Sequence, residues 1–449
     1  MASNMPSPHN IAVLEVVIES LCHYCTPRQP LHKLPCLNAH CPAECAGRDQ
    51  ERRDIVTLAA LCLTSKHINA FATPHLYHRP TCRQWPLLAR TLLSRPDLAG
   101  HVRHLCLRDW ISVYFALPDP TFPVEVAEYW DGKVDYHVEA GPGAAAECLE
   151  ADNIELSLVL PLCPNIEELD VPLGYGDALC FSDAGPMRKL RTVVAAYDDP
   201  GSGMNLGSLA PLVPAAPNLS TLVGWQVNAC RDMPVLENVT HLRLGRSSME
   251  LEGLRRALHA CPRLETLEYG AGGSVVGYDQ FTPLEAQGTL VELAPRLKSL
   301  SLNFDDALSH DALVGEGWVL QSLSGLKSLQ KLEMDTRCFV AHMNPMSTTK
   351  VKGPNGEWVL YNPGPVPGLG REALVELLPT SIREVHISRG RYGPELLRVV
   401  DALEGLAAGA ERFSELRRVE VRGRGEESVE GVRSIFEARG VALSIPGVD

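Results

Sequence analysis

The chain repeats one apolar pattern: an apolar residue, two variable residues, a second apolar residue, one variable residue and a third apolar residue. Between residues 166 and 329 successive copies begin 20 to 33 residues apart. Apolar residues two apart point to the same face of a strand, so each triplet predicts a short strand with one buried face. The copies, the last two of them weaker, are Val102-Leu105-Leu107, Ile166-Leu169-Val171, Val239-Leu242-Leu244, Leu264-Leu267-Tyr269, Leu297-Leu300-Leu302, Leu329-Leu332-Met334, Ile382-Val385-Ile387, Leu416-Val419-Val421, Leu190-Val193 and Leu219-Leu222.

Helix-like apolar segments precede several of these triplets, and each ends in a turn that contains proline or polar residues. They are Leu251-Leu254-Leu258, Leu290-Leu293 and Leu374-Leu377-Leu378. Burying three anchors per unit supplies ~5–9 kcal/mol, whereas ordering some 25 residues costs ~1–2 kcal/mol each. The units must therefore stack. The period is similar to that of leucine-rich repeats, so we expect an α/β fold in which residues 92–443 form a leucine-rich-repeat solenoid, or horseshoe.

Stacked strands would present their alternate residues in a row along the concave face. By this register the row contains His104, Glu168, Asp170, Thr192, Trp225, His241, Arg243, Glu268, Asn303, Lys331, Glu333, Glu384, His386, Arg418 and Glu420. Among them we expect partner contacts from Glu168, Asp170, Trp225, His241, Arg243, Glu268, Lys331, Glu333, His386 and Arg418. The mixed charge favours a protein ligand over a phosphate backbone. The alternative is that these residues are only solvated strand positions.

Two insertions interrupt the period. Residues 109–155 hold eleven acidic residues against one basic residue, Lys133, together with seven aromatic side chains. This composition is suited to binding a basic segment of a partner protein. The alternative is that the insertion forms an elaborated cap, whose aromatic side chains pack under the solenoid. The second insertion, residues 338–371, is rich in Gly and Pro, and its segment Lys350 to Tyr361 predicts a hairpin around Pro354-Asn355-Gly356.

A helical module is predicted over residues 9–80, ahead of the repeats. Ile11, Leu14, Val17, Ile18 and Leu21 share one helix face, and Ile55, Leu58, Ala59 and Cys62 share another. Ile68, Phe71 and Ala72 suggest a third helix that ends before Pro74. The stretches "AVLEVVIESL" (Ala12 to Leu21) and "DIVTLAALCLTSKHINAFATPHLYH" (Asp54 to His78) resemble the F-box-like helical module common in fungal proteins. Likewise "LLSRPDLAGHVRHLCL" (Leu92 to Leu107) resembles the junction that precedes their leucine-rich repeats.

The resemblance implies a surface that binds the Skp-type adaptor of a cullin ubiquitin ligase. The positions that match the family's helical core and adaptor surface are Val13, Leu14, Val17, Leu58, Leu61, Ser65 and Lys66. A short helical module with spare apolar surface also suits docking against partner helices. The alternative is a helical cap on the N-terminal end of the solenoid.

A Cys/His-rich insertion, residues 22–53, separates the first two predicted helices. Five cysteines, Cys22, Cys25, Cys36, Cys41 and Cys45, lie there with His23, His32 and His40. Cys22-x2-Cys25 can hold one side of a tetrahedral zinc ion, and Cys36 with Cys41 or Cys45 can complete it. The competing interpretation is a loop of reduced cysteines without metal and hence without any cofactor.

Charge and motif content narrow the functions. The formal net charge is -14 and no basic stripe stands out, which argues against nucleic acid as a partner. We find no signal peptide and no membrane span, and so expect a cytoplasmic or nuclear protein without membrane partners. P-loop, HExxH and GxSxG motifs are absent from the sequence, so we expect no enzyme and no catalytic residues. The leading hypothesis is a protein-interaction adaptor, specifically the substrate-recognition subunit of an SCF-type cullin ubiquitin ligase with an unidentified protein substrate. The alternative is a leucine-rich-repeat scaffold without a ligase role.

Overall fold

The computed structural model describes residues 8–22, 25, 42–80, 85–106, 159–172, 186–196, 203–272, 280–304, 319–339, 350–352, 358–360, 370–388, 396–422 and 430–444. The acidic aromatic insertion at 109–155 lies outside these residues. The chain divides into two compact units. The first comprises Met1–Pro172, Leu179–Val193 and Pro214–Asn218, and the second Leu173–Ala178, Val194–Val213 and Leu219–Asp449.

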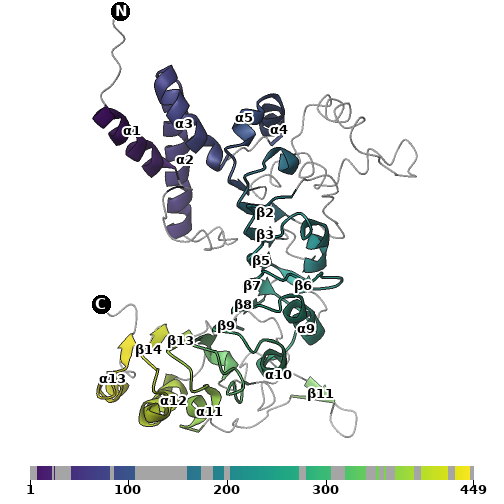
Figure 1. Cartoon of the computed structure of the whole chain (residues 1–449). Helices are drawn as coiled ribbons and strands as arrows, with labels where there is room; N and C mark the ends of the chain where they lie inside the picture. Colours follow the sequence, from purple (N-terminus) through teal and green to yellow (C-terminus); the bar gives the residue numbers. More distant parts are fainter. Residues whose placement is uncertain are drawn as a thin grey trace, which may run out of the picture. The chain divides into compact units, whose positions relative to one another are not determined.

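Three helices open the first unit: α1 (Pro8–Leu21), α2 (Pro42–Cys62) and α3 (Lys66–His78) (Figure 1). Each contributes one fully buried residue to a shared core, Ile18, Leu58 and Ala72. Partly buried apolar side chains surround these three, namely Leu14, Leu21, Leu61, Cys62, Phe71 and Leu76. The helical periodicity of residues 9–80 is thereby confirmed as three packed helices.

Two helix boundaries in this module differ from the sequence prediction. Helix α2 begins at Pro42, so the second half of the expected insertion at 22–53 includes helix. Helix α3 does not end before Pro74 but continues through it to His78. Proline removes one backbone donor from a helix interior, yet Ala72 and Leu76 pack into the core on either side of it. This tertiary packing holds the final turn in place.

Two short helices, α4 (Trp85–Ser94) and α5 (Pro96–Ala99), lead to strand β1 (His104–Cys106). Strand β1 pairs in parallel with β2 (Glu168–Pro172). The backbone N–H of Arg103 donates to the carbonyl oxygen of His78 at 3.0 Å, which ties the helical module to the first strand. The division between the two compact units falls inside the run of repeats.

Among the described residues, eleven strands belong to one sheet, in the order β1-β2-β3-β5-β7-β8-β9-β10-β13-β14-β15. Each of the ten predicted triplets lies at one of these strands. After β1 and β2 the strands are β3 (Thr192–Ala196), β5 (Thr221–Trp225), β7 (His241–Ser247), β8 (Thr266–Ala271), β9 (Ser299–Asn303), β10 (Lys331–Asp335), β13 (Glu384–Ser388), β14 (Arg418–Arg422) and β15 (Ala442–Ser444). The last of them, β15, was not anticipated.

In-register pairing of the anchors organises the core of the second unit. From β7 to β15 the parallel ladder aligns, in order, Leu242, Leu267, Leu300, Leu332, Val385, Val419 and Leu443. All seven side chains are buried. The middle anchor of each triplet therefore stacks on its equivalent in the neighbouring repeat, as the repeated pattern requires.

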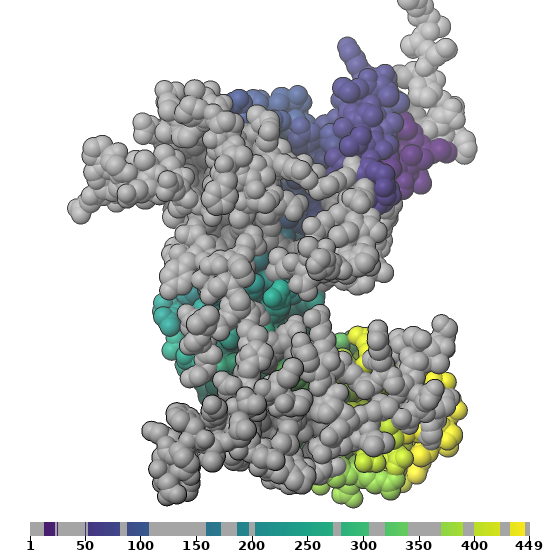
Figure 2. Space-filling view, turned by 180° about the vertical axis from the view of Figure 1, so that it is seen from behind, coloured from purple at the N-terminus to yellow at the C-terminus, as the bar shows by residue number. Residues whose placement is uncertain are grey.

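Helices cover one face of this sheet, and they are α9 (Leu251–Ala260), α10 (Pro283–Leu293), α11 (Ala373–Leu377), α12 (Leu396–Ala408) and α13 (Glu430–Glu437) (Figure 1). Helix α10 begins with a capping box between Thr282 and Glu285. The C-terminal elements gather in one green-to-yellow body in the space-filling view (Figure 2). The result is an α/β fold with a long parallel sheet, an arrangement compatible with leucine-rich repeats.

Shorter elements also lie between the strands, in some repeats in addition to an α-helix. These are the 3-10 segments η2 (Leu160–Leu162), η3 (Leu206–Leu212), η4 (Thr336–Cys338) and η5 (Ala410–Arg412), and the parallel pair β4 (Met204–Asn205) and β6 (Val227–Ala229). The predicted hairpin in the second insertion is confirmed, because β11 (Lys350–Lys352) pairs antiparallel with β12 (Trp358–Leu360). No helix in the described part of the chain is both long and apolar enough to cross a bilayer.

Candidate functional site

Polar residues line the face of the sheet opposite the buried anchors. In the second unit the register aligns one row of Arg243, Glu268, Ser301, Glu333, His386 and Glu420, and a parallel row of His241, Thr266, Ser299, Lys331, Glu384 and Arg418. We call these twelve residues the polar rows. Seven residues expected from the sequence to contact a partner fall in them. Each row places side chains from different repeats at adjacent positions.

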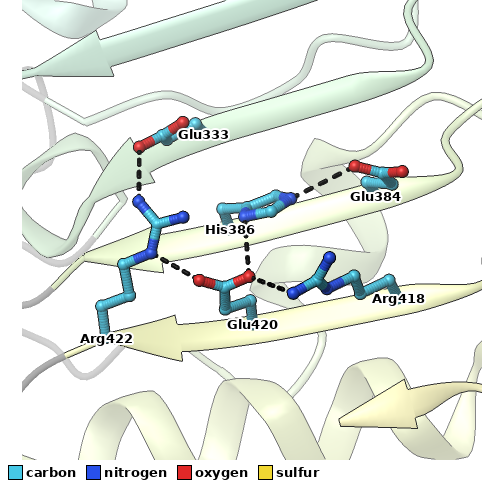
Figure 3. A network of polar contacts seen from close by, with 6 residues as sticks. All are labelled: Glu333, Glu384, His386, Arg418, Glu420 and Arg422. Atoms are coloured by element: carbon cyan, nitrogen blue, oxygen red, sulfur yellow. Dashed lines mark hydrogen bonds and ion pairs between the residues drawn. The ribbon is translucent and has the colours of Figure 1, made fainter. Parts of the chain in front are cut away.

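A network of charged groups occupies the polar rows at β10, β13 and β14 (Figure 3). Glu420 is its centre: one carboxylate oxygen lies 2.8 Å from Nη2 of Arg418 and 3.3 Å from Nδ1 of His386, and the other oxygen accepts from Nε of Arg422. Arg422 also reaches across to Glu333, with 3.2 Å between Nη1 and Oε1. Nε2 of His386 lies 3.3 Å from Oε2 of Glu384. The network thus joins three consecutive strands of the sheet.

The Glu420 carboxylate is buried, with its side chain only 4% exposed. Burial acts to raise the pKa of Glu420, but the hydrogen bond from Arg422, the positive charges of Arg422 and Arg418 and the electrostatic effect of the nearby His386 outweigh it. The pKa of Glu420 is therefore held below its ordinary value, and the carboxylate stays ionised. In turn, the hydrogen bond with Glu420 raises the pKa of Arg422. Arg422 was missed by the sequence prediction, although it continues the strand alternation two positions beyond Glu420.

Burial separates the expected partner contacts into two groups. His386 is 4% exposed and Asp170 is 6% exposed, so neither presents a free side chain to a partner, contrary to the expectation from strand alternation. Their long or charged neighbours cover them; His386, for example, lies between Glu384 and Glu420. Accessible charge comes from Arg418 and Glu268, which are 49% and 44% exposed, and from Glu384 of the polar rows, which is 44% exposed and was not among the expected contacts.

The remaining expected contacts are partly or fully accessible. Arg243 pairs with Glu268, with 3.0 Å between Nε and Oε2. His241 is exposed, while Lys331 and Glu333 are partly exposed. In the first unit, Glu168 is partly exposed and its Oε2 lies 3.4 Å from Nδ1 of His104.

Trp225 provides an aromatic surface beside the polar rows. A Cβ added at Gly245, its register partner on β7, would come within 2.0 Å of the Trp225 ring. Glycine at this position therefore lets the indole lie across the neighbouring strand. The ring is partly exposed, and Nε1 of Trp225 has no hydrogen-bond partner among the described residues. The Nε1 atom itself is buried, so the exposed part of Trp225 is its apolar ring surface.

The residues implied in adaptor binding occupy different environments in the helical module. Val13 and Val17 are 53% and 47% exposed, and Lys66 is exposed. Leu58 is only 2% exposed, so it serves the core and not a docking face. Leu14 and Leu61 pack against that core. Ser65 caps α3, because its Oγ accepts a hydrogen bond from the N–H of Ile68 at 3.2 Å.

Further apolar side chains on the same module are exposed, and the resemblance did not single them out. Val16 is 65% exposed on α1, while Val56 and Leu63 on α2 and just after it are 68% and 88% exposed. Such a surface can be recognised in the sequence, because these apolar residues fall outside the face that each helix turns toward the core.

A cluster of four metal-type ligands lies in the first unit. One ligand atom each from Cys22, Cys25, His75 and His78 lies within 4.8 Å of the others. The histidines were not anticipated; the available signal was their own two-residue spacing, which matches that of Cys22-x2-Cys25. Of the other expected ligands, Cys36 and Cys41 lie outside the described residues. Cys45 lies within α2, in a part of that helix where only the backbone is described.

Burial controls the acid–base state of this cluster. Desolvation, together with the adjacent Cys22, raises the pKa of the Cys25 thiol to about 12. Desolvation, reinforced by the nearby His75 and Arg103, lowers the pKa of His78 to about 4, and desolvation also lowers the pKa of His75. Both imidazoles are therefore neutral near pH 7. The cysteines whose side chains are described, Cys22 and Cys25 included, form no disulfides.

Comparison with known proteins gives no family assignment. No protein-family model and no curated protein matches the sequence. Among solved structures, the chain is similar to the one described as "Crystal structure of TLR13-ssRNA13 complex", with 12% identity and a TM-score of 0.34. The match covers 78% of this chain and 44% of that chain, so it spans less than half of the other protein. A TM-score this low carries no argument about function.

Proposed function

We propose that this protein is a protein-interaction adaptor in which the polar rows and Trp225 hold a protein partner. The observation that carries the proposal is the in-register alignment of the polar rows across β7 to β14. Alternating acidic, basic and aromatic groups on one rigid sheet face suit a protein surface, whereas a phosphate backbone requires concentrated positive charge. A role of this kind needs no catalytic group in the chain itself.

The specific form that we propose is the substrate-recognition subunit of an SCF-type cullin ubiquitin ligase. The resemblance of residues 12–21 and 54–78 to the F-box-like module supports it, as do the exposed Val13 and Val17 on α1. In this role the helical module binds the Skp-type adaptor, and the sheet holds a substrate near the enzyme that transfers ubiquitin. Holding the substrate raises its effective concentration. The second candidate is a scaffold that uses the same sheet face without a ligase.

Adaptor binding is tested directly with the purified full-length chain and a purified Skp-type adaptor in a calorimetric titration. Val13→Asp with Val17→Asp is expected to weaken binding at least ~10-fold, because it places charge at the centre of an apolar contact. The matched control is Val235→Asp, since Val235 is 58% exposed but lies in the second unit. If the unaltered chain shows no binding, the ligase role is rejected and the scaffold role is retained.

The sheet face is tested by proximity labelling in cells with a paired substitution. Trp225→Ala with Lys331→Ala removes an aromatic and a cationic group from the proposed face, and is expected to reduce labelling of the true partners by ~10-fold or more. His259→Ala with Lys327→Ala is the matched control, because both side chains are exposed and neither lies in the polar rows. An identical set of labelled proteins for the unaltered chain and the test pair would contradict the assignment of this face.

A further inference from the structure

Two pairs of ligands meet where the ends of α1 and α3 come together. Cys22 follows directly after α1, and Cys25 lies three positions further along the chain. His75 and His78 lie in the last turn of α3, three positions apart, and therefore share one face of that helix. The Sγ atom of Cys22 also lies 3.6 Å from the carbonyl oxygen of His75. This convergence is independent of the polar rows and of the partner-binding proposal.

The distances within this group match those around a tetrahedral zinc ion. With Zn–S of about 2.3 Å and Zn–N of about 2.0–2.1 Å, tetrahedral geometry separates sulfur from nitrogen by about 3.5 Å. The observed distances are 3.5 Å from Cys22 Sγ to His78 Nδ1, 3.4 Å from Cys25 Sγ to His75 Nδ1 and 3.3 Å from Cys25 Sγ to His78 Nδ1. The two imidazole planes are inclined at 66°, so the rings are not stacked and both Nδ1 atoms can face a common centre.

The donor set selects the metal. Two thiolates and two imidazoles suit zinc, whereas calcium and magnesium require oxygen ligands. Iron–sulfur clusters are held by cysteine thiolates, in most cases four. A site with four protein ligands leaves no position for water or substrate, which is typical of a structural metal and not of a catalytic one.

We propose that Cys22, Cys25, His75 and His78 bind one structural zinc ion that fastens the end of α1 to the last turn of α3. The module has reason to use such a link, because its core is small: among its residues whose side chains are described, the core cluster contains three fully buried ones, Ile18, Leu58 and Ala72. The backbone of His78 also accepts the hydrogen bond from Arg103 that leads into β1. Zinc therefore fixes the point at which the helical module continues into the parallel sheet.

The test is the zinc content of the purified full-length chain, measured by mass spectrometry after exhaustive dialysis. We expect about one zinc per chain, and a value near zero for His75→Asn with His78→Asn. His67→Asn is the matched control, since His67 is exposed on the same helix and lies outside the cluster. A second variant, His78→Cys, replaces imidazole by thiolate and is expected to retain zinc, because Cys₃His is also a structural zinc set.

Three outcomes would overturn this proposal. One is an unaltered chain without zinc; another is a double histidine variant that keeps its zinc, which would place the metal on other cysteines. The third is a thiol count that shows a disulfide between Cys22 and Cys25. Circular dichroism of each variant reports whether the helices persist. If the double variant unfolds, retention of zinc by His78→Cys together with its loss in His78→Asn still supports the proposal.

Replacement of zinc by cobalt is an independent test of the ligands. Tetrahedral ligation that includes thiolates gives cobalt an intense visible absorption spectrum, and octahedral ligation by oxygen does not.

Discussion

Leu332→Ala is expected to lower the free energy of unfolding by about 3 kcal/mol, since removal of a fully buried leucine side chain costs about 2–5 kcal/mol. Leu332 has no exposed surface and is paired in register with Leu300 on one side and Val385 on the other. Its loss therefore leaves a cavity in the middle of the anchor ladder. Urea unfolding followed by circular dichroism measures the change.

The matched control for Leu332→Ala is its neighbour Lys331→Ala. Lys331 points to the opposite face of β10 and is partly exposed, so its replacement is expected to change stability by no more than about 0.5 kcal/mol. Equal destabilisation by the two substitutions would contradict the assignment of the two faces.

Glu420→Ala is expected to cost about 2 kcal/mol, because it leaves the groups around a buried carboxylate without their acceptor. Arg418, Arg422 and His386 all approach that carboxylate. The estimate lies below the full cost of breaking a buried ion pair because Arg418 and Arg422 are about half exposed and regain water. Chemical unfolding at pH 7 measures this cost. Glu411→Ala, which removes a 79% exposed carboxylate paired with Arg439, is the control and is expected to have little effect.

The same carboxylate gives the protein an acid-sensitive component of stability. The pKa of Glu420 is lower in the folded chain than its ordinary value near 4.5. Its contribution is therefore fully present above that ordinary pKa and is lost as the pH falls through the lower folded-state pKa. Glu420→Gln is expected to flatten this part of the stability profile, measured by urea unfolding between about pH 6 and pH 2. An unchanged acid slope in the variant would contradict the assignment.

The strand positions could be predicted because they depend on local alternation. A triplet such as Leu329-Leu332-Met334 sets which face is apolar, and stacking then sets the parallel register. Strand β15 was missed because the first anchor position of its triplet, three residues before Leu443, holds Gly440, which has no apolar side chain. Pattern alone did not distinguish the α-helices from the 3-10 segments such as η3. The continuation of α3 through Pro74 depends on tertiary packing that local propensity does not contain.

The candidate sites, like the fold, could be predicted from the sequence only where they depend on local pattern. Alternation correctly placed Lys331 and Glu333 on the polar side of β10, but it could not show that His386 is covered by its neighbours. The spacing of Cys22 and Cys25 correctly indicated one pair of metal-type ligands. The other ligands expected from the sequence, Cys36 with Cys41 or Cys45, were chosen because they lie nearby in the chain. The structure brings His75 and His78 to Cys22 and Cys25 through the packing of α1 against α3. Long-range pairing of this kind carries no local signature.

The parallel register has a consequence for how the polar face can be imitated or blocked. Side chains that lie next to each other on it, such as Lys331, Glu384 and Arg418, are supplied by segments dozens of positions apart in the chain. No excised peptide holds two such neighbours, so linear fragments cannot compete with the intact molecule. An antibody raised against this epitope should lose recognition on denaturing blots.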